Sequence, residues 1–254
     1  GLKNIISIGG SLFMQQSSNQ NSNEQRKNMQ KLQWLRMSVQ LIFVAILIGG
    51  LYKFVKPAFV VILPLAFLAG NFFCGWLCPF GTAQEIFGKL GSLFIKKKFK
   101  VSPSLQRDVQ FSRYILAAIV FAHIVDSLVD LSSINAYKTF MRAMSGNLAQ
   151  TAATFIMGTF LVVALFFERP FCNYFCPEGI KFGLASLTRF FSIKRNSDTC
   201  IHCKCCDKAC PMNIEVSKGN HVRNAQCINC FKCMAACPKQ DTLTYGRVNP
   251  LKRD

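Results

Sequence analysis

The sequence predicts a mainly α-helical membrane protein with a small, cysteine-rich α+β domain at its C-terminal end. Hydrophobic residues make up 51% of the 254-residue chain and mean hydropathy is +0.26, which is high for a soluble protein. Apolar segments fill much of the first two thirds of the chain, and 13 cysteines gather mostly in short repeated motifs. We expect a disordered or loosely ordered tail at 1–33, a membrane domain at 34–195 and the cysteine-rich domain at 196–254. The tail is rich in Gln, Asn and Ser and has no apolar run long enough for a signal peptide.

Four apolar segments in the membrane domain predict four transmembrane helices. A segment of 16 or 17 residues extends about 25 Å as a helix. This is slightly less than the hydrocarbon core, so Arg36, Lys53 and Lys56 are expected to extend to the headgroups. The third segment carries His123, and an ionisable residue inside a span usually has a function, so His123 is a candidate quinone or proton-transfer site. The segments are residues 37–52, 57–73, 114–131 and 143–167.

Basic residues indicate the orientation of the membrane domain, because Lys and Arg beside the spans favour the cytoplasmic side. The N-terminal stretch and the loop at 74–113 together carry twelve basic residues, whereas the two opposite connections carry four. We therefore expect a multi-pass protein of the cytoplasmic (inner) membrane with both termini and the cysteine-rich domain in the cytoplasm. The net charge of +18 is then explained by a basic face at the membrane and not by binding to nucleic acid.

An internal repeat organises the membrane domain. The sequence Phe-Cys-Gly-Trp-Leu-Cys-Pro-Phe-Gly at 73–81 recurs 98 residues later as Phe-Cys-Asn-Tyr-Phe-Cys-Pro-Glu-Gly at 171–179. Each copy follows a pair of apolar segments and precedes a stretch with the periodicity of an amphipathic surface helix, at 86–98 and 180–195. We expect two parallel repeats related by a pseudo-twofold axis along the membrane normal. The matching Trp76 and Tyr174 are expected to anchor the protein at the membrane interface.

The duplicated motif supplies two pairs of cysteines, Cys74 with Cys78 and Cys172 with Cys176. In a helical turn, positions i and i+4 place both sulfur atoms on one face, and the proline after the second cysteine redirects the chain. If the two repeats meet, their four sulfur atoms can hold a metal centre, whether [4Fe-4S], [2Fe-2S] or a single iron. It would be a third centre beside the two clusters predicted for the C-terminal domain. Buried unreactive cysteines or disulfides are the alternative.

The C-terminal domain contains the sequence Cys-x2-Cys-x2-Cys-x3-Cys-Pro twice, the second copy 27 residues after the first. This spacing is typical of bacterial-type two-cluster ferredoxins, in which the fourth cysteine of each motif binds the other [4Fe-4S] cluster. A pair of zinc sites fits less well, because each zinc ion requires two Cys-x2-Cys pairs. The expected ligands are Cys200, Cys203, Cys206 and Cys237 for cluster 1, and Cys227, Cys230, Cys233 and Cys210 for cluster 2.

Two further features of this domain are informative. Cys205 lies outside the motif and is interpreted as a small buried side chain, with an alternative ligand or a redox-reactive thiol as the other readings. Residues 194–254 carry eleven Lys and Arg against five Asp and Glu. This positive charge favours lipid headgroups or an acidic redox partner and raises cluster potentials.

The combination of two Cys-x3-Cys-Pro motifs with a basic two-cluster ferredoxin domain resembles the membrane ferredoxins NapH, NosR and CcoG. The resemblance covers residues 35–250 and is strongest to NapH, since the chain has no room for the periplasmic flavin domain of NosR or the long final domain of CcoG. It implies a subunit that relays single electrons between a cytoplasmic or quinol donor and a membrane or periplasmic reductase. The implied partners are the membrane, other redox subunits with flavin, cytochrome or iron–sulfur centres, and a quinone. Such a subunit counts as part of an enzyme only within its complex.

Two other functions remain open. A CcoG-like assembly factor for a respiratory oxidase would bind or reduce copper with the membrane-level thiolates, which are soft ligands that suit Cu(I). A redox sensor would use Cys205 and labile clusters to detect oxidants.

Overall fold

The computed structural model describes the N-terminal helix, both Cys-x3-Cys-Pro motifs and the cysteine-rich domain as far as residue 248. His123 and nearly all of the expected third span lie outside the described residues. The described residues are 24, 27–48, 62, 64–94, 105–106, 108–109, 111–112, 114–115, 118, 136–144 and 151–248.

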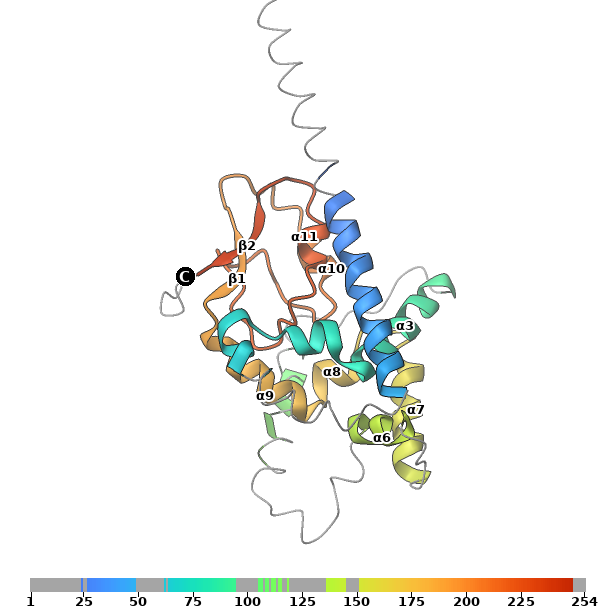
Figure 1. The fold of residues 1–254 in the computed structure, drawn as a ribbon. Coiled ribbons are helices and arrows are strands. Elements are labelled where there is room, and N and C mark those ends of the chain that lie inside the picture. Colours follow the sequence, from blue (N-terminus) through green and yellow to red (C-terminus); the bar gives the residue numbers. More distant parts are fainter. Residues whose placement is uncertain are drawn as a thin grey trace, which may run out of the picture.

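The first helix spans Lys27–Ile48 and is the blue helix of Figure 1. The helix begins at Lys27, inside the region 1–33 that we expected to be disordered or loosely ordered. Met29 and Leu32 stabilise its first turns because they pack against the core of the C-terminal domain. Its second half leaves apolar side chains such as Ile42 and Ile48 mostly exposed. Among the described residues, it is the one helix long and apolar enough to cross a membrane by length and composition.

The first cysteine motif follows a short helix at 64–69 that ends at Gly70. Gly70 has φ +92°, a conformation that side chains disfavour, and a Cβ there would lie 2.6 Å from the Asn229 amide nitrogen. The chain continues as the π-helix η1 (Phe73–Leu77) and the long helix α3 (Pro79–Phe94).

The second repeat differs from the expected helices at two places. The span expected at 143–167 forms α7 (Thr151–Val163), which packs against α6 (Ala136–Met144) and ends before a turn. The short helix α8 (Pro170–Tyr174) carries the second motif and is followed by α9 (Pro177–Ala185) and the 3-10 turn η2 (Ser186–Thr188). The amphipathic helix expected at 180–195 therefore stops early, because its last residues pair as a strand.

The C-terminal domain is built on a two-stranded antiparallel sheet. Strand β1 (Phe191–Arg195) pairs with β2 (Leu243–Arg247), and Ile193 lies opposite Tyr245. The helices α10 (Cys205–Ala209) and α11 (Lys232–Ala235) lie between the strands in sequence and against each other in space (Figure 1). The sheet places the start of this domain at β1 and not at the expected residue 196.

Candidate metal centres

One cavity in the C-terminal domain, named site 1, is lined by four cysteines from both copies of the motif. Three come from the loop before α10 and from α10, and the fourth follows α11. The cavity has a volume of about 20 Å³, and its wall includes Arg195, Ile201 and Leu243. The cysteines of site 1 are Cys200, Cys203, Cys206 and Cys237.

A second cavity, named site 2, is lined by the complementary set of cysteines. It also has a volume of about 20 Å³, and the rest of its wall is largely apolar. Each site thus takes three cysteines from one motif and one from the other, in two cavities of nearly equal size. Four thiols in an apolar wall fit a [4Fe-4S] cluster, although the assignment of ligands stays a prediction. The cysteines of site 2 are Cys210, Cys227, Cys230 and Cys233.

The two sites differ in their access to solvent. Cys203 of site 1 is exposed and the other three cysteines of that site are half-buried. All four cysteines of site 2 are buried, none more than 8% exposed. Burial raises the pKa of the Cys210 thiol to about 12, and the nearby Cys230 adds to the effect. A thiolate in site 2 therefore requires a compensating positive charge from a metal centre or from the protein.

Both Cys-x3-Cys-Pro motifs of the membrane domain adopt the same local geometry. The backbone N–H of Cys78 donates to the Phe73 carbonyl at 2.8 Å, and that of Cys176 donates to the Phe171 carbonyl at 3.0 Å. Each bond joins residues five apart, the pattern of a π-turn. The second cysteine then precedes a helix whose first residue is proline, a favoured position for proline. The expected helical i, i+4 arrangement is therefore wrong at the second cysteine, which lies just outside the turn.

The sulfur atoms of these second cysteines lie at helix N-termini. The N–H of Gly81 donates to the Cys78 Sγ at 3.4 Å, and the N–H of Gly179 donates to the Cys176 Sγ at the same distance. A helix N-terminus and an N–H donor both favour negative charge on sulfur. The two motifs thus place the sulfur atoms of Cys78 and Cys176 in equivalent positions, where each accepts a hydrogen bond from a backbone N–H.

The four cysteines of the two motifs lie close enough to affect one another, and we name them the CxxxCP site. Burial raises the pKa of the Cys78 thiol, and Cys172 and Cys74 raise it further. Burial also raises the pKa of the Cys176 thiol well above its ordinary value, again with contributions from the other three cysteines. The side chain of Gln84 in α3 donates to the Cys172 Sγ at 3.4 Å and accepts from the Phe171 N–H at 3.2 Å. Gln84 therefore joins the first repeat to the second.

A buried carboxylate next to the CxxxCP site gathers three cations, and we name this group the Glu85 cluster. Arg36 of the first helix and Arg169 before α8 both bind the carboxylate, the latter at 2.8 Å, and Lys232 of α11 lies 3.1 Å from it. Burial would raise the pKa of Glu85, but Arg169, Lys232 and Arg36 hold it well below its usual range. With one negative and three positive charges among the described residues, the cluster carries a net charge of +2 at a largely buried position. Arg169 also donates to the Cys74 carbonyl at 2.8 Å.

The CxxxCP motifs pack directly against site 2. A Cβ on Gly75 would lie 2.0 Å from the Ile228 carbonyl oxygen, so the two backbones are in contact. The Trp76 indole donates to the Asn229 carbonyl at 3.0 Å, and Asn173 of the second repeat donates to the Pro211 carbonyl at 3.1 Å. Both repeats therefore contact segments that carry cysteines of site 2.

Several residues have roles that differ from those expected. Trp76 packs against Phe231, and the Tyr174 hydroxyl donates to Gln106 at 2.6 Å, so neither is explained as a membrane anchor. Arg36 is 1% exposed and pairs with Glu85, so it does not extend to headgroups. Cys205 is half-buried and does not line site 1, although it lies within hydrogen-bonding reach of Cys203.

Sequence reasoning missed the Glu85 cluster. The signal for Glu85 was a lone acidic residue in the apolar helix α3, and the signal for Arg169 was its place just before the second motif.

Within the described residues, no three His, Cys, Asp or Glu side chains come close enough to hold a single metal ion.

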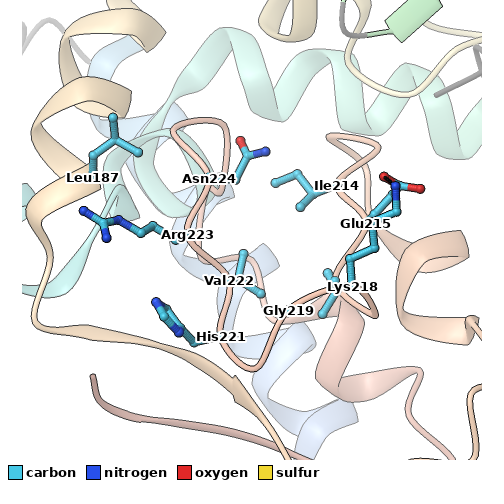
Figure 2. A pocket seen from close by; sticks show the side chains of 10 residues that line it. Leu187, Ile214, Glu215, Lys218, Gly219, His221, Val222, Arg223 and Asn224 are labelled. Carbon is cyan, nitrogen blue, oxygen red and sulfur yellow. Dashed lines mark ion pairs between the residues drawn. The ribbon is translucent and has the colours of Figure 1, made fainter. Parts of the chain in front are cut away.

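A larger open cavity of about 620 Å³ lies on another side of site 2. Figure 2 shows its rim, with Arg223 and Leu187 on one side and the ion pair of Glu215 and Lys218 on the other. Ile214, Val216 and Val222 line both this cavity and site 2. This apolar layer separates site 2 from the open cavity.

The chain is similar to known iron–sulfur proteins. A family model described as a 4Fe-4S binding domain matches residues 58–102 and 150–196, and each match contains one Cys-x3-Cys-Pro motif. A model described as a 4Fe-4S dicluster domain matches residues 192–248. The uncharacterized protein MJ0749 of Methanocaldococcus jannaschii is 30% identical over 209 residues, 75% of this chain and 78% of that protein.

The chain belongs to the NapH/NosR-type family of 4Fe-4S ferredoxins. Within this family, the Escherichia coli protein YccM, named for electron transport, is 33% identical over 199 residues, 76% of this chain but 55% of YccM. The ferredoxin-type protein NapH of Haemophilus influenzae is 25% identical over 156 residues, 61% of this chain and 52% of NapH. The chain thus spans about half the length of these two family members. No solved structure matches the chain significantly. The family and its domains support an iron–sulfur electron-transfer role.

Proposed function

We propose that this family member is a membrane-bound subunit that relays single electrons through three centres. Sites 1 and 2 hold one [4Fe-4S] cluster each, and the CxxxCP site, formed by Cys74, Cys78, Cys172 and Cys176, holds the third. Bound clusters supply one-electron oxidation and reduction. The observation that carries the proposal is the gathering of the ferredoxin cysteines, four by four, around two cavities.

The order of the relay follows from exposure and contact. Site 1 has an exposed cysteine, Cys203, so it is the position that a cytoplasmic donor reaches. Site 2 is buried and contacts both CxxxCP motifs through Gly75 and Asn173. The protein around site 2 thus excludes water and fixes the separation between site 2 and the CxxxCP site.

The charge around the CxxxCP site supports a third centre there. The Glu85 cluster leaves two positive charges buried, and buried charges require compensation. Burial alone would lower the pKa of the Arg169 guanidinium, but the negative charges of Glu85, Cys172 and Cys230 outweigh it and raise the pKa of Arg169. Anionic thiolates that hold a metal centre would supply the missing negative charge.

The proposed location is the cytoplasmic (inner) membrane, with four spans in two parallel repeats and both termini in the cytoplasm. The exposed apolar side chains on the second half of Lys27–Ile48 support contact with lipid. From the CxxxCP site, electrons pass to a quinone, with His123 as a candidate contact, or to a flavin, cytochrome or iron–sulfur centre of a partner subunit. The end point is a membrane or periplasmic reductase.

The test is to measure iron and acid-labile sulfide per chain, together with low-temperature EPR of the reduced protein. Wild type is expected to hold more than about 8 irons, falling to about 8 in the double variant Cys74→Ala/Cys172→Ala. Cys205→Ala is the matched control, because Cys205 lines neither cavity, and it should keep the full content.

A wild-type content of about 8 irons with EPR unchanged in the double variant would contradict the third centre. Stoichiometric copper that the double variant loses would then put a CcoG-like copper-handling function first.

A further inference from the structure

Two arginines, Arg189 just before β1 and Arg195 at the end of β1, lie beside sites 2 and 1. Arg189 is 3% exposed, donates to the Val222 carbonyl and to the Ser192 hydroxyl, and lies within hydrogen-bonding reach of the Cys227 thiol of site 2. Arg195 lines site 1 and donates from Nε to the Gly219 carbonyl at 2.9 Å. Each site therefore has its own guanidinium.

In the described part of the chain, no ion pair joins Arg189 or Arg195 to a carboxylate. One buried Nη1 atom of each also has no hydrogen-bond partner among the described residues. A buried cation without a partner is costly, so each position favours a negatively charged group in the adjacent site.

The two sites differ in the amount of buried positive charge. Site 2 has the buried Arg189, and Arg169 lies near its Cys230, while Lys232 of the Glu85 cluster precedes Cys233 in sequence. Site 1 has Arg195, which is half-buried, and lysines such as Lys204 and Lys239 that are exposed. Charges in contact with water are screened much more strongly than buried charges.

We propose that Arg189 and Arg195 are positioning residues that set the reduction potentials of sites 2 and 1, and that site 2 is the more oxidising of the two. Positive charge beside an iron–sulfur cluster stabilises the form that carries the extra electron. An electron that enters at site 1 therefore moves inward to site 2. This inference rests on the proposed function, because it requires a cluster in both sites.

The test is an EPR-monitored redox titration of the full-length protein in detergent, with the site 1 signal identified by its change in Cys203→Ser. In wild type, site 2 is expected to become reduced at the higher potential. Arg189→Gln should lower the ratio of reduced to oxidised site 2 at least tenfold at a fixed potential, about 59 mV for one electron. Arg189→Lys, which keeps the charge, should restore most of the shift.

Arg195→Gln should shift site 1 in the same direction and leave site 2 unchanged. The matched control is Arg223→Gln, since Arg223 is exposed and lines the open cavity, and it should shift neither site. A higher potential at site 1 in wild type would overturn the inference, as would an unshifted site 2 in Arg189→Gln with full iron content. If Arg189→Gln does not fold, the wild-type order and the Arg195→Gln titration decide. A wild-type protein without clusters would instead refute the proposed function itself.

Discussion

Sites 1 and 2 have the same cysteine spacing but different surroundings. Site 1 lies at the surface with Cys203 exposed, whereas every cysteine of site 2 is buried. The cover over site 2 comes from the membrane domain, for example from Trp76, which bonds to Asn229 across 153 positions of sequence. The comparison teaches that local spacing arranges the cysteines of each site, while distant parts of the chain determine how much solvent reaches them.

The largest loss of stability is expected from Glu85→Gln. This change removes the negative charge that holds Arg36, Arg169 and Lys232 together. Leaving buried cations unpaired costs about 3–5 kcal/mol. Thermal and denaturant unfolding in detergent should show this loss of stability. A loss below about 1 kcal/mol would mean that the Glu85 cluster is not needed to join the two domains.

A smaller effect is expected from Gly75→Ala. The new methyl group would lie 2.0 Å from the Ile228 carbonyl oxygen, so the repeat and site 2 must move apart. Overpacking of this kind costs about 1–3 kcal/mol or more. The matched control is Gly158→Ala in α7, where a Cβ meets nothing within 4 Å and the helix gains a better former. Equal melting temperatures for the two variants would contradict the contact.

The difference between the sites should also appear as unequal sensitivity to oxidants. On addition of ferricyanide to wild type, the site 1 EPR signal should disappear about tenfold faster than that of site 2, because solvent access governs attack. Gly75→Ala should reduce this ratio by exposing site 2. Simultaneous loss of both signals in wild type would show that burial does not protect site 2.

The smallest effect is expected at the exposed pair of Glu215 and Lys218, whose charged atoms lie 2.6 Å apart. Glu215→Gln should change stability by no more than about 1 kcal/mol, since exposed ion pairs contribute little. Measured beside Glu85→Gln, it separates the effect of burial from that of removing a carboxylate.

The composition of the two cavities could be anticipated because it is a local property. Three cysteines at intervals of three can wrap around one cluster, and the proline after the fourth turns it away. Cys237 accordingly lines the cavity of the first motif and Cys210 that of the second. The duplication of the CxxxCP motif was equally visible in the sequence, and both copies have the same hydrogen bonds.

The contacts between the domains could not be anticipated, because they depend on residues far apart in sequence. Trp and Arg are residue types that often lie at the membrane interface or extend to headgroups, yet Trp76 donates to Asn229 and Arg36 pairs with Glu85 inside the protein. A π-turn at Cys74 leaves no pattern in hydrophobic periodicity, which assumes 3.6 residues per turn. The role of His123 and the four-span arrangement stay predictions.

The helix Lys27–Ile48 is hydrogen-bonded both to the backbone of site 2 and to the first CxxxCP motif. Gln33 donates to the Cys230 carbonyl at 2.9 Å, and one and two turns later Arg36 and Gln40 donate to the Gly75 carbonyl. The helix therefore fixes the position of the ferredoxin domain relative to the first repeat. In the proposed relay, electron transfer from site 2 to the CxxxCP site therefore requires no domain movement.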